Sequence, residues 1–325
     1  MHAQPNPSVA SAVGRSPYRY RVYGLTLETG YPFPLLRTEP DAGRVPDITA
    51  RFGPVAPPAA PCVWEDRGVS LHADGSALLT VPGALRIAIR DGAEMLVEAT
   101  PGLPDAMLHA WLFGPAMGAL WHQRGTPPLH ACVVAMGGLA VALAGDSGVG
   151  KSTTARALIA RGHGLLSDDQ AIVDPATLLV QPGWPAIKVW ADTAAATGDT
   201  VDPALRVREG LDKFHLPLEP AFQREALPLG LVVVIERNGD AGPFDPDVVS
   251  WQKGAALLKR FMFRPRFGDR LDGGRAQFAW TLAVARRVPV IRLRRPDDLS
   301  ALGPACDRIE EIVGTRTREG LRHGT

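Results

Sequence analysis

The residues with the clearest chemical meaning form a glycine-rich segment near the middle of the chain. Residues 145–152 read GDSGVGKS and match the pattern G-x-x-x-x-G-K-[ST], with an apolar stretch before them and a helix-like stretch after them. Glycines allow successive backbone N–H groups to converge on a phosphate, and the helix that follows adds the positive end of its dipole. In such a site Lys151 reaches the β- and γ-phosphates of a nucleotide, and the Ser152 hydroxyl is a Mg²⁺ ligand. We therefore expect ATP and Mg²⁺ as cofactors, bound by Gly145, Asp146, Ser147, Gly148, Val149, Gly150, Lys151, Ser152 and Thr153.

An acidic pair is the second candidate. Asp168 and Asp169 follow the mainly apolar residues 164–167, and Asp168 comes 17 residues after Lys151. Apolar residues followed by aspartate are typical of a Walker B strand, whose carboxylate holds Mg²⁺. Because two adjacent carboxylates repel each other, they differ in protonation. This favours one aspartate as a metal ligand and the other as a base toward an attacking hydroxyl, the alternative being a turn capped by aspartates.

A hairpin must bring these residues together. Residues 131–136 and 139–144 are apolar strands separated by Gly137-Gly138, a typical hairpin turn, and the second strand leads into the glycine-rich segment. His130 begins the first strand, where a lone histidine is more often structural than catalytic. The other elements expected in this half are helices at 151–161 and 251–261 (N-cap Ser250), a final helix capped by Asp297 and interrupted or restarted by Pro304, and strands at 165–167, 171–173, 178–180, 229–236 and 288–293.

The chain before residue 129 has a different pattern. Alternating apolar residues predict strands within 18–36 and at 69–71, 77–81, 85–89 and 95–99, whereas 39–63 is rich in Pro, Gly and Ala and predicts a loop. Residues 105–124 predict a buried helix broken at Gly114-Pro115. The fold class is α/β. The expected parts are a small, mainly-β N-terminal domain at 1–101 with 1–17 disordered, a helical connector at 102–128, a P-loop domain at 129–300, and a C-terminal helix and tail at 301–325.

Composition excludes several classes of protein. The chain has 325 residues, of which 46% are hydrophobic and 21% charged, and this length predicts two domains. The net charge of +1 provides no global field for nucleic acid or an anionic membrane. Only five of the 35 basic residues are lysines. The charge is uneven, because residues 251–325 contain 16 basic and 8 acidic side chains; a solvated basic face would also produce this excess.

Cysteine spacing and hydropathy bear on the compartment. Cys62, Cys132 and Cys306 form no C-x-x-C pair, so neither a disulfide framework nor a zinc site is indicated. Residues 1–17 do not have the pattern of a signal peptide, and the most apolar stretch, 106–121, is shorter than a membrane helix. We expect a cytoplasmic protein.

Together the motifs resemble a known family. Leu129-His130-Ala131, the hairpin, GDSGVGKS, Arg161-Gly162-His163 and Leu166-Ser167-Asp168-Asp169 resemble the catalytic domain of HPr kinase/phosphorylase over about 45 residues. The resemblance implies a P-loop kinase domain similar to phosphoenolpyruvate carboxykinase, acting on a serine hydroxyl. It implies Asp168 as the general base, Asp169 as a metal ligand with Ser152, and His130 and Lys151 as further catalytic residues.

The chain also departs from that family. Residues 185–190 read PAIKVW, without the glutamate of the Glu-Ile-Arg-Gly-type signature associated with dephosphorylation. The N-terminal segment beginning YRVYGL, together with DKFHLP at 212–217 and VPVIRLRRP at 288–296, resembles HPr-kinase-related proteins of peptide-modification systems, including kinases of lasso-peptide precursors. We therefore expect a serine kinase whose substrate is a peptide or small protein. Assembly into a homo-oligomer is compatible with this expectation. HPr kinase/phosphorylase proper, a small-metabolite kinase and a non-kinase nucleotide switch are the alternatives.

The basic segment 260–275 is the remaining candidate. Arg260, Arg264, Arg266 and Arg270 fall in a stretch that contains Pro265 and Gly268 and predicts a loop. A mobile arginine loop could close over the γ-phosphate, or bind an acidic peptide or a neighbouring subunit. Lys213 and His215 are weaker candidates.

Overall fold

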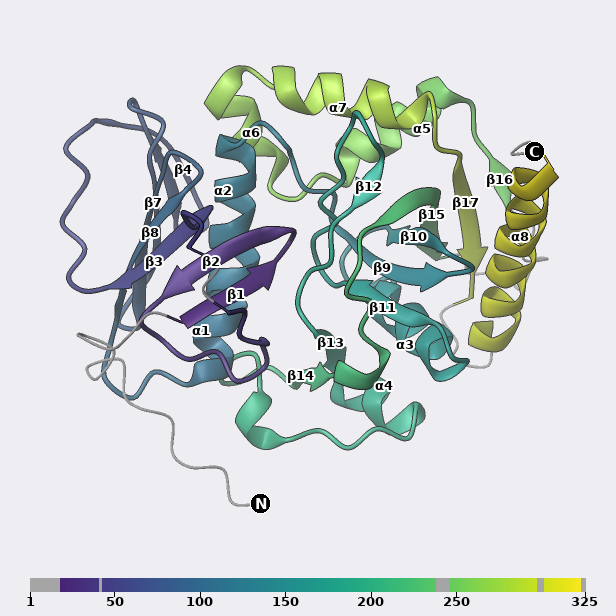
Figure 1. Ribbon diagram of the computed structural model, residues 1–325, viewed down its shortest axis with the longest axis horizontal. Coiled ribbons are helices and arrows are strands. Elements are labelled where there is room, and N and C mark those ends of the chain that lie inside the picture. Colours follow the sequence, from purple (N-terminus) through teal and green to yellow (C-terminus); the bar gives the residue numbers. More distant parts are fainter. Residues whose placement is uncertain (1–17, 41–42, 238–245, 297–300, 323–325) are drawn as a thin grey trace.

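The computed structural model describes residues 18–40, 43–237, 246–296 and 301–322. The expected disorder of residues 1–17, the cap at Asp297 and the tail at 323–325 lie outside the described residues. The chain forms two large β-sheets, with a helical segment between them (Figure 1).

The N-terminal sheet has eight strands in the order β1-β2-β3-β8-β7-β6-β5-β4. Its strands are β1 (Tyr18–Val22), β2 (Leu25–Thr29), β3 (Ile48–Phe52), β4 (Cys62–Asp66), β5 (Val69–His72), β6 (Ala77–Val81), β7 (Leu85–Arg90) and β8 (Glu94–Ala99). The loop expected at 39–63 is wrong, because it contains β3 and the first residues of β4. Ile48 and Ala50 alternate into the core, and β3 pairs in parallel with both β2 and β8. Those partners are distant in sequence, so local composition did not reveal the strand.

The connector is a continuous helical segment with an inserted π-turn. It consists of α1 (Asp105–Trp111), the π-helix η2 (Leu112–Ala116) and α2 (Met117–Gln123). The expected break at Gly114-Pro115 is therefore wrong. The wider π-turn accommodates Pro115, and its carbonyl groups at Phe113 and Gly114 accept hydrogen bonds from Gln170 Nε2 at 3.0 and 2.7 Å.

The second large sheet has the strand order β11-β9-β10-β15-β17-β16, with β12 pairing to β15. Its strands are β9 (Ala131–Met136), β10 (Leu139–Ala144), β11 (Gly164–Ser167), β12 (Leu179–Val180), β15 (Leu227–Arg237), β16 (Asp247–Val248) and β17 (Val290–Arg295). A separate two-stranded sheet contains β13 (Ala186–Trp190) and β14 (Lys213–Pro217). The helices are α3 (Lys151–Ala160), α4 (Ala191–Ala196), η3 (Pro203–Leu205), η4 (Glu219–Ala221), α5 (Trp251–Arg260), α6 (Pro265–Asp272), α7 (Arg275–Ala285) and α8 (Leu302–Arg322).

Several expected elements in this half are confirmed. β9 and β10 pair through a two-residue turn in which Gly137 and Gly138 both have positive φ, as a type I′ hairpin requires. Ser250 accepts a hydrogen bond from the backbone N–H of Lys253 and caps α5. Residues 171–173 do not form the expected strand but only isolated bridges.

The loop expected over the basic segment is also wrong. Residues 265–272 form α6, since Pro265 occupies the first turn, where its missing N–H costs nothing. Gly268 lies within this helix, and the position requires glycine because a Cβ there would come within 2.2 Å of Gln277 Nε2. Pro304 likewise lies in the first turn of α8 and does not interrupt it.

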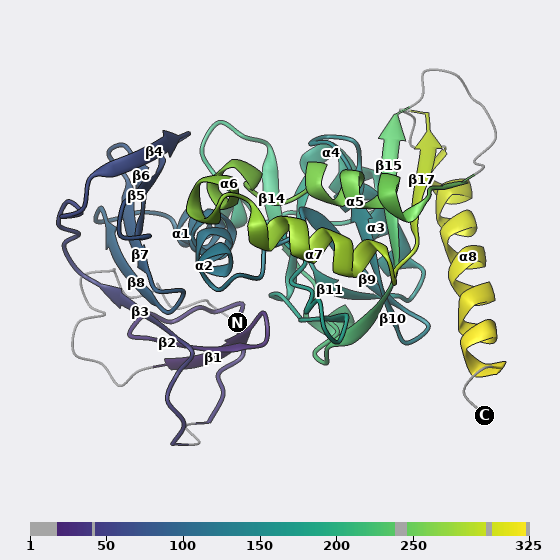
Figure 2. The ribbon, with the colours of Figure 1, turned by 90° about the horizontal axis from the view of Figure 1, so that it is seen from above.

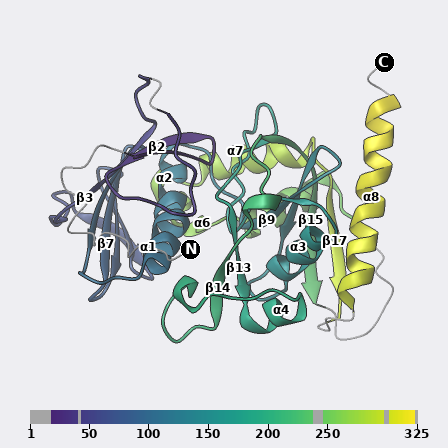
Figure 3. The ribbon, with the colours of Figure 1, turned by 60° about the horizontal axis from the view of Figure 1, so that its bottom comes forward.

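Helices on the two faces of the second sheet complete its core. Leu158 of α3 and the α8 residues Cys306 and Ile309 belong to one buried apolar cluster, and α8 runs along the edge of the molecule (Figure 3). On the other face, α5 and α7 pack through Leu258, Trp280 and neighbouring apolar side chains. Among the described helices, none combines the length and apolar content needed to cross a bilayer.

Candidate active site

The glycine-rich loop joins the end of β10 to the start of α3. Gly145, Gly148 and Gly150 have φ values of 142°, 80° and 99°, which L side chains rarely adopt. A Cβ on Gly145 would also lie 2.6 Å from the carbonyl oxygen of Ile235. The loop therefore requires glycine at Gly145 for both its conformation and its close approach to β15.

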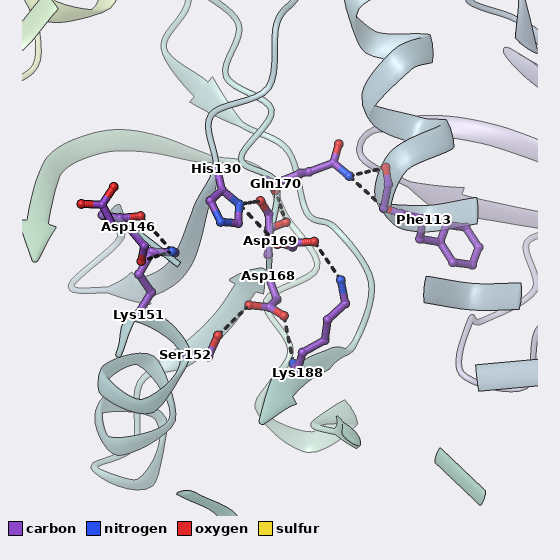
Figure 4. Close-up of polar contacts among 12 residues, drawn as sticks. Phe113, His130, Asp146, Lys151, Ser152, Asp168, Asp169, Gln170 and Lys188 are labelled. Carbon is purple, nitrogen blue, oxygen red and sulfur yellow. Dashed lines mark hydrogen bonds and ion pairs between the residues drawn. The ribbon is translucent and has the colours of Figure 1, made fainter. Parts of the chain in front are cut away.

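Lys151 lies under this loop. Its ammonium group donates hydrogen bonds to the carbonyl oxygens of Gly145 and Asp146, at 2.9 and 3.1 Å (Figure 4). Burial lowers the pKa of Lys151, while the carboxylates of Asp169 and Asp168 act in the opposite direction. Two side chains of the loop region point elsewhere: Asp146 forms an exposed ion pair with Arg260, and Val149 is buried in the apolar core.

Asp168 faces the start of α3. Its Oδ1 accepts a hydrogen bond of 3.4 Å from the Ser152 hydroxyl, and its Oδ2 accepts one of 2.9 Å from the backbone N–H of Lys188. The residue is only 3% exposed. Beside it, burial and the Asp168 charge raise the pKa of the Cys132 thiol, which therefore stays protonated.

Asp169 faces a different set of partners. Its Oδ2 lies 2.8 Å from the ammonium nitrogen of Lys188, and its Oδ1 lies 3.3 Å from His130 Nδ1 (Figure 4). His130 Nδ1 also donates to the backbone carbonyl of Asp169 at 2.9 Å. Burial acts to raise the pKa of Asp169, but Lys188 and His130 outweigh it and hold that pKa well below its usual range. Asp169 is therefore ionised and 28% of its side chain is exposed.

The backbone around the acidic pair is held from both sides. Asp169 has φ 70°, in the left-handed region, and the Ser167 hydroxyl donates to the Gln170 carbonyl at 2.5 Å. The Gln170 side chain reaches the π-turn at Phe113, as Figure 4 shows. The connector thus fixes the direction in which the two carboxylates point.

These groups surround one cavity of about 120 Å³. Of the residues expected from the sequence, those that line it are His130, Ser147, Gly148, Gly150, Lys151, Ser152, Thr153, Asp168 and Asp169. Lys213 also lines it, whereas His215 is buried against Trp184 and the carbonyl of Ala106.

The sequence interpretation missed Lys188, Cys132 and Trp190, which also line the cavity. The scarcity of lysine was the available signal, because three of the five lysines in the chain, Lys151, Lys188 and Lys213, meet here. Burial acts to lower the pKa of Lys188, but Asp169 and Asp168 raise it above its usual value. Lys188 is therefore a charged partner of the acidic pair.

The donor atoms are of the kind that suit Mg²⁺. A hydroxyl from Ser152 and a carboxylate from Asp168 lie together, and Mg²⁺ prefers hard oxygen ligands completed by phosphate and water. No group of three His, Cys, Asp or Glu side chains that could hold a metal occurs in the part of the chain that the structure describes. The sequence interpretation paired Ser152 with Asp169 for the metal, but the carboxylate beside Ser152 is Asp168.

The fold and this site together define an α/β protein in which a glycine-rich strand–loop–helix faces paired carboxylates. Comparisons with known proteins match the segment that contains both features. Residues 125–178 match the family model of the HPr Serine kinase C-terminal domain. Over 89 residues the chain is 51% identical to the HPr kinase/phosphorylase of Lacticaseibacillus casei (strain BL23), covering 25% of this chain and 27% of that protein. Over 57 residues it is 46% identical to the HPr kinase/phosphorylase of Enterococcus faecalis, covering 17% and 18%. These findings show that residues 125–178 are similar to the HPr Serine kinase C-terminal domain and that part of the chain is similar to HPr kinase/phosphorylases.

The extent of the matches is limited. Each of these alignments spans about a quarter or less of the relative's length. The solved structure of the Hpr(Ser) kinase/phosphatase from Coxiella burnetii is similar at 13% identity and a TM-score of 0.26, covering 60% of this chain and 95% of that one.

Proposed function

We propose that this chain is an ATP-dependent serine kinase that transfers the γ-phosphoryl group of ATP to a hydroxyl of a peptide or small protein. The observation that carries the proposal is the convergence of Lys151, Ser152 and two differently held aspartates on one cavity. The similarity to HPr kinase/phosphorylases over residues 125–178 supports the reaction class. We further propose a cytoplasmic location, and we propose no role in binding nucleic acid or a membrane.

Ser152 and Asp168 are the residues that would hold Mg²⁺. When bound, the metal would neutralise phosphate charge. Asp168 suits the role of a metal ligand because it is almost fully buried and already accepts a hydrogen bond from the Ser152 hydroxyl. The backbone N–H groups of the glycine-rich loop and the Lys151 ammonium group would surround the phosphates.

Asp169 is the better-placed base for the acceptor hydroxyl, in place of Asp168. Its carboxylate is ionised and partly exposed, so a hydroxyl could reach it. In the transfer, the seryl oxygen bonds to the γ-phosphorus while the bond from that phosphorus to the β–γ bridging oxygen breaks. The proton passes to Asp169, and ADP leaves with the bonding electron pair. A weakly basic carboxylate suffices, because the transition state of phosphoryl transfer is loose.

His130 and Lys188 are positioning residues in this scheme. His130 holds both the backbone and the carboxylate of Asp169, and burial lowers the pKa of its ring. Lys188 fixes the two carboxylates relative to each other and offsets their mutual repulsion.

The proposal is tested by incubating the protein with ATP, Mg²⁺ and either HPr or a set of serine-containing peptides, and measuring acceptor mass. A gain of one phosphoryl group that maps to serine supports it. Lys151→Met should abolish the gain, whereas Lys253→Met, at an exposed lysine of α5, should leave it unchanged. ATP binding without any phosphorylated acceptor would favour the nucleotide switch, and transfer to HPr alone would favour HPr kinase proper.

A further inference from the structure

Arg264 has an unusual backbone at the edge of the candidate active site. Its φ is 49° and its ψ 56°, in the left-handed region that residues other than glycine rarely occupy. Such strain persists only where the surrounding structure holds it, and it is concentrated at functional sites. The contacts around Arg264 therefore need explanation.

The preceding residue, Phe263, is held on three sides. Its N–H donates to the Pro128 carbonyl at 2.8 Å, and its carbonyl lies 2.8 Å from His122 Nε2. Its ring packs on His130, with 5.8 Å between ring centroids, and occupies space that a Cβ on Gly118 would fill. Arg264 is thus fixed relative to His130, the histidine that holds Asp169.

The guanidinium group of Arg264 has no ion pair or hydrogen bond among the residues that the structure describes. It is only half-buried, and the charges that act on it are those of Asp66, Arg67 and Asp169. A partly desolvated arginine without a partner is costly, and its fixed fork of N–H donors suits a carboxylate.

A second cation approaches from the N-terminal sheet. Arg67 lies in the turn between β4 and β5, is exposed, and also has no side-chain partner within the described ranges. The sheet lies beside α6 (Figure 2). The contacts between them include Trp64 and Phe267, whose ring centroids are 6.2 Å apart, and Asp66, which lies 3.6 Å from Arg266. The two unpartnered arginines therefore come from two distant parts of the chain and lie close enough for their charges to interact.

The position of Arg264 assigns it to the acceptor side. The glycine-rich loop, where the phosphates would bind, already has a cation of its own in Lys151, and Lys213 also lines the cavity. Arg264 instead follows Phe263, whose ring packs on His130, and the charge of Asp169 acts on its guanidinium group; these are the proposed base and its positioning residue. An anion that bound here would belong to the acceptor.

We propose that Arg264, assisted by Arg67, binds a side-chain carboxylate of the acceptor, so that the enzyme selects serines in acidic segments. This inference rests on the proposed kinase function. A bidentate arginine–carboxylate pair would both attract the segment and orient the serine toward Asp169.

The test uses serine peptides capped at both ends, with either Glu or Gln at the three positions on each side of the serine. We expect wild-type kcat/KM to be about tenfold or more higher for the Glu peptide. Arg264→Gly should remove this preference by raising KM for the Glu peptide alone, and glycine favours the left-handed backbone, so folding is preserved. Arg264→Lys should restore part of the preference. Arg270→Gln, at an exposed arginine of α6, the helix that begins directly after Arg264, is the matched control and should keep the preference.

Equal wild-type kcat/KM values for the two peptides would overturn the inference while leaving the kinase function intact. A fall in kcat on both peptides in Arg264→Gly would also overturn it, because Arg264 would then act on the transferring phosphoryl group. If neither peptide is phosphorylated, the kinase proposal fails for these acceptors and fluorescence anisotropy with the labelled peptides decides the inference separately. Tighter binding of the Glu peptide that is lost in Arg264→Gly supports it, and equal or absent binding contradicts it.

Discussion

Lys188 contacts both members of the acidic pair. Its ammonium nitrogen lies 2.8 Å from Oδ2 of Asp169, and its backbone N–H donates a hydrogen bond to Asp168. One residue of a small two-stranded sheet thus fixes both carboxylates of the candidate active site. The arrangement separates their surroundings, because one carboxylate faces the start of α3 and the other faces Lys188 and His130 (Figure 4).

Lys188→Met should therefore reduce phosphoryl transfer by about 10²-fold or more, since it removes the charge that orients Asp169. Lys188→Arg should retain more activity. The substitution to Met should also raise the pKa of Asp169. A depressed carboxyl pKa contributes stability above the unfolded pKa of about 3.9, and that stability is lost as pH falls through the folded pKa. Thermal unfolding between pH 3 and 7 should thus show a smaller loss of stability on acidification in Lys188→Met than in the wild type, because the folded and unfolded pKa values of Asp169 then differ less. Identical acid limbs in the two proteins would contradict the ion pair.

The sequence predicted the parts of this site that are contiguous. The hairpin, the glycine-rich loop and the strand before Asp168 follow one another within about 40 residues, and each has a local signature. Lys188 has none, because it comes from β13 and meets the aspartates only through the folding of a separate sheet. The choice between Asp168 and Asp169 as metal ligand likewise depended on which carboxylate faces Ser152. Sequence spacing does not distinguish the roles of two adjacent residues of the same type.

Gly145 and Gly148 provide a matched pair of substitutions in the glycine-rich loop. Gly145→Ala places a Cβ 2.6 Å from the Ile235 carbonyl oxygen as well as straining the backbone, and should cost about 3 kcal/mol of unfolding free energy. Gly148→Ala meets nothing within 4 Å and should cost about 1 kcal/mol from its positive φ alone. Urea unfolding measures both, and equal losses would show that the close approach to β15 is not limiting.

His109 should make the protein sensitive to mild acid. Burial lowers its pKa to about 4, and neither ring nitrogen has a hydrogen-bond partner among the described residues. Between this value and the unfolded pKa of about 6.5, the unfolded chain binds a proton that the folded chain does not, so stability falls as pH decreases. The loss at pH 5 should be about 2 kcal/mol relative to pH 8. His109→Phe, among the rings of Phe33, Phe113 and Trp184, should remove this difference in urea unfolding. An unchanged difference would assign it to other groups.

The thiols should differ sharply in reactivity. Cys62 is exposed, whereas Cys132 and Cys306 are buried, and burial next to Asp168 raises the pKa of Cys132. A disulfide reagent such as DTNB should therefore titrate one thiol rapidly in the native protein and three after denaturation. A second rapid thiol that disappears in Cys132→Ala would show that the cavity is more open than its structure indicates.

Local composition led to wrong predictions for elements that depend on partners distant in the sequence. β3 was hidden in a Pro- and Gly-rich stretch because its parallel neighbours, β2 and β8, lie far from it in the chain. Pro265 and Gly268 suggested a loop, yet Pro265 begins α6 and Gly268 gives His122 and Gln277 room to pack against it. In both cases tertiary packing outweighed local propensity.

The central claim is that Asp168 serves the metal and Asp169 serves the acceptor hydroxyl. Single-turnover transfer to a phosphorylatable serine acceptor, measured over a range of Mg²⁺ concentrations, tests it most directly in Asp168→Asn and Asp169→Asn. We predict that Asp169→Asn keeps a near wild-type Mg²⁺ requirement but loses about 10²- to 10⁴-fold in the transfer rate at saturating Mg²⁺. Asp168→Asn should instead raise the Mg²⁺ concentration needed for half-maximal transfer. The reverse pattern, or an Asp169→Asn variant that transfers at the wild-type rate, would contradict the account.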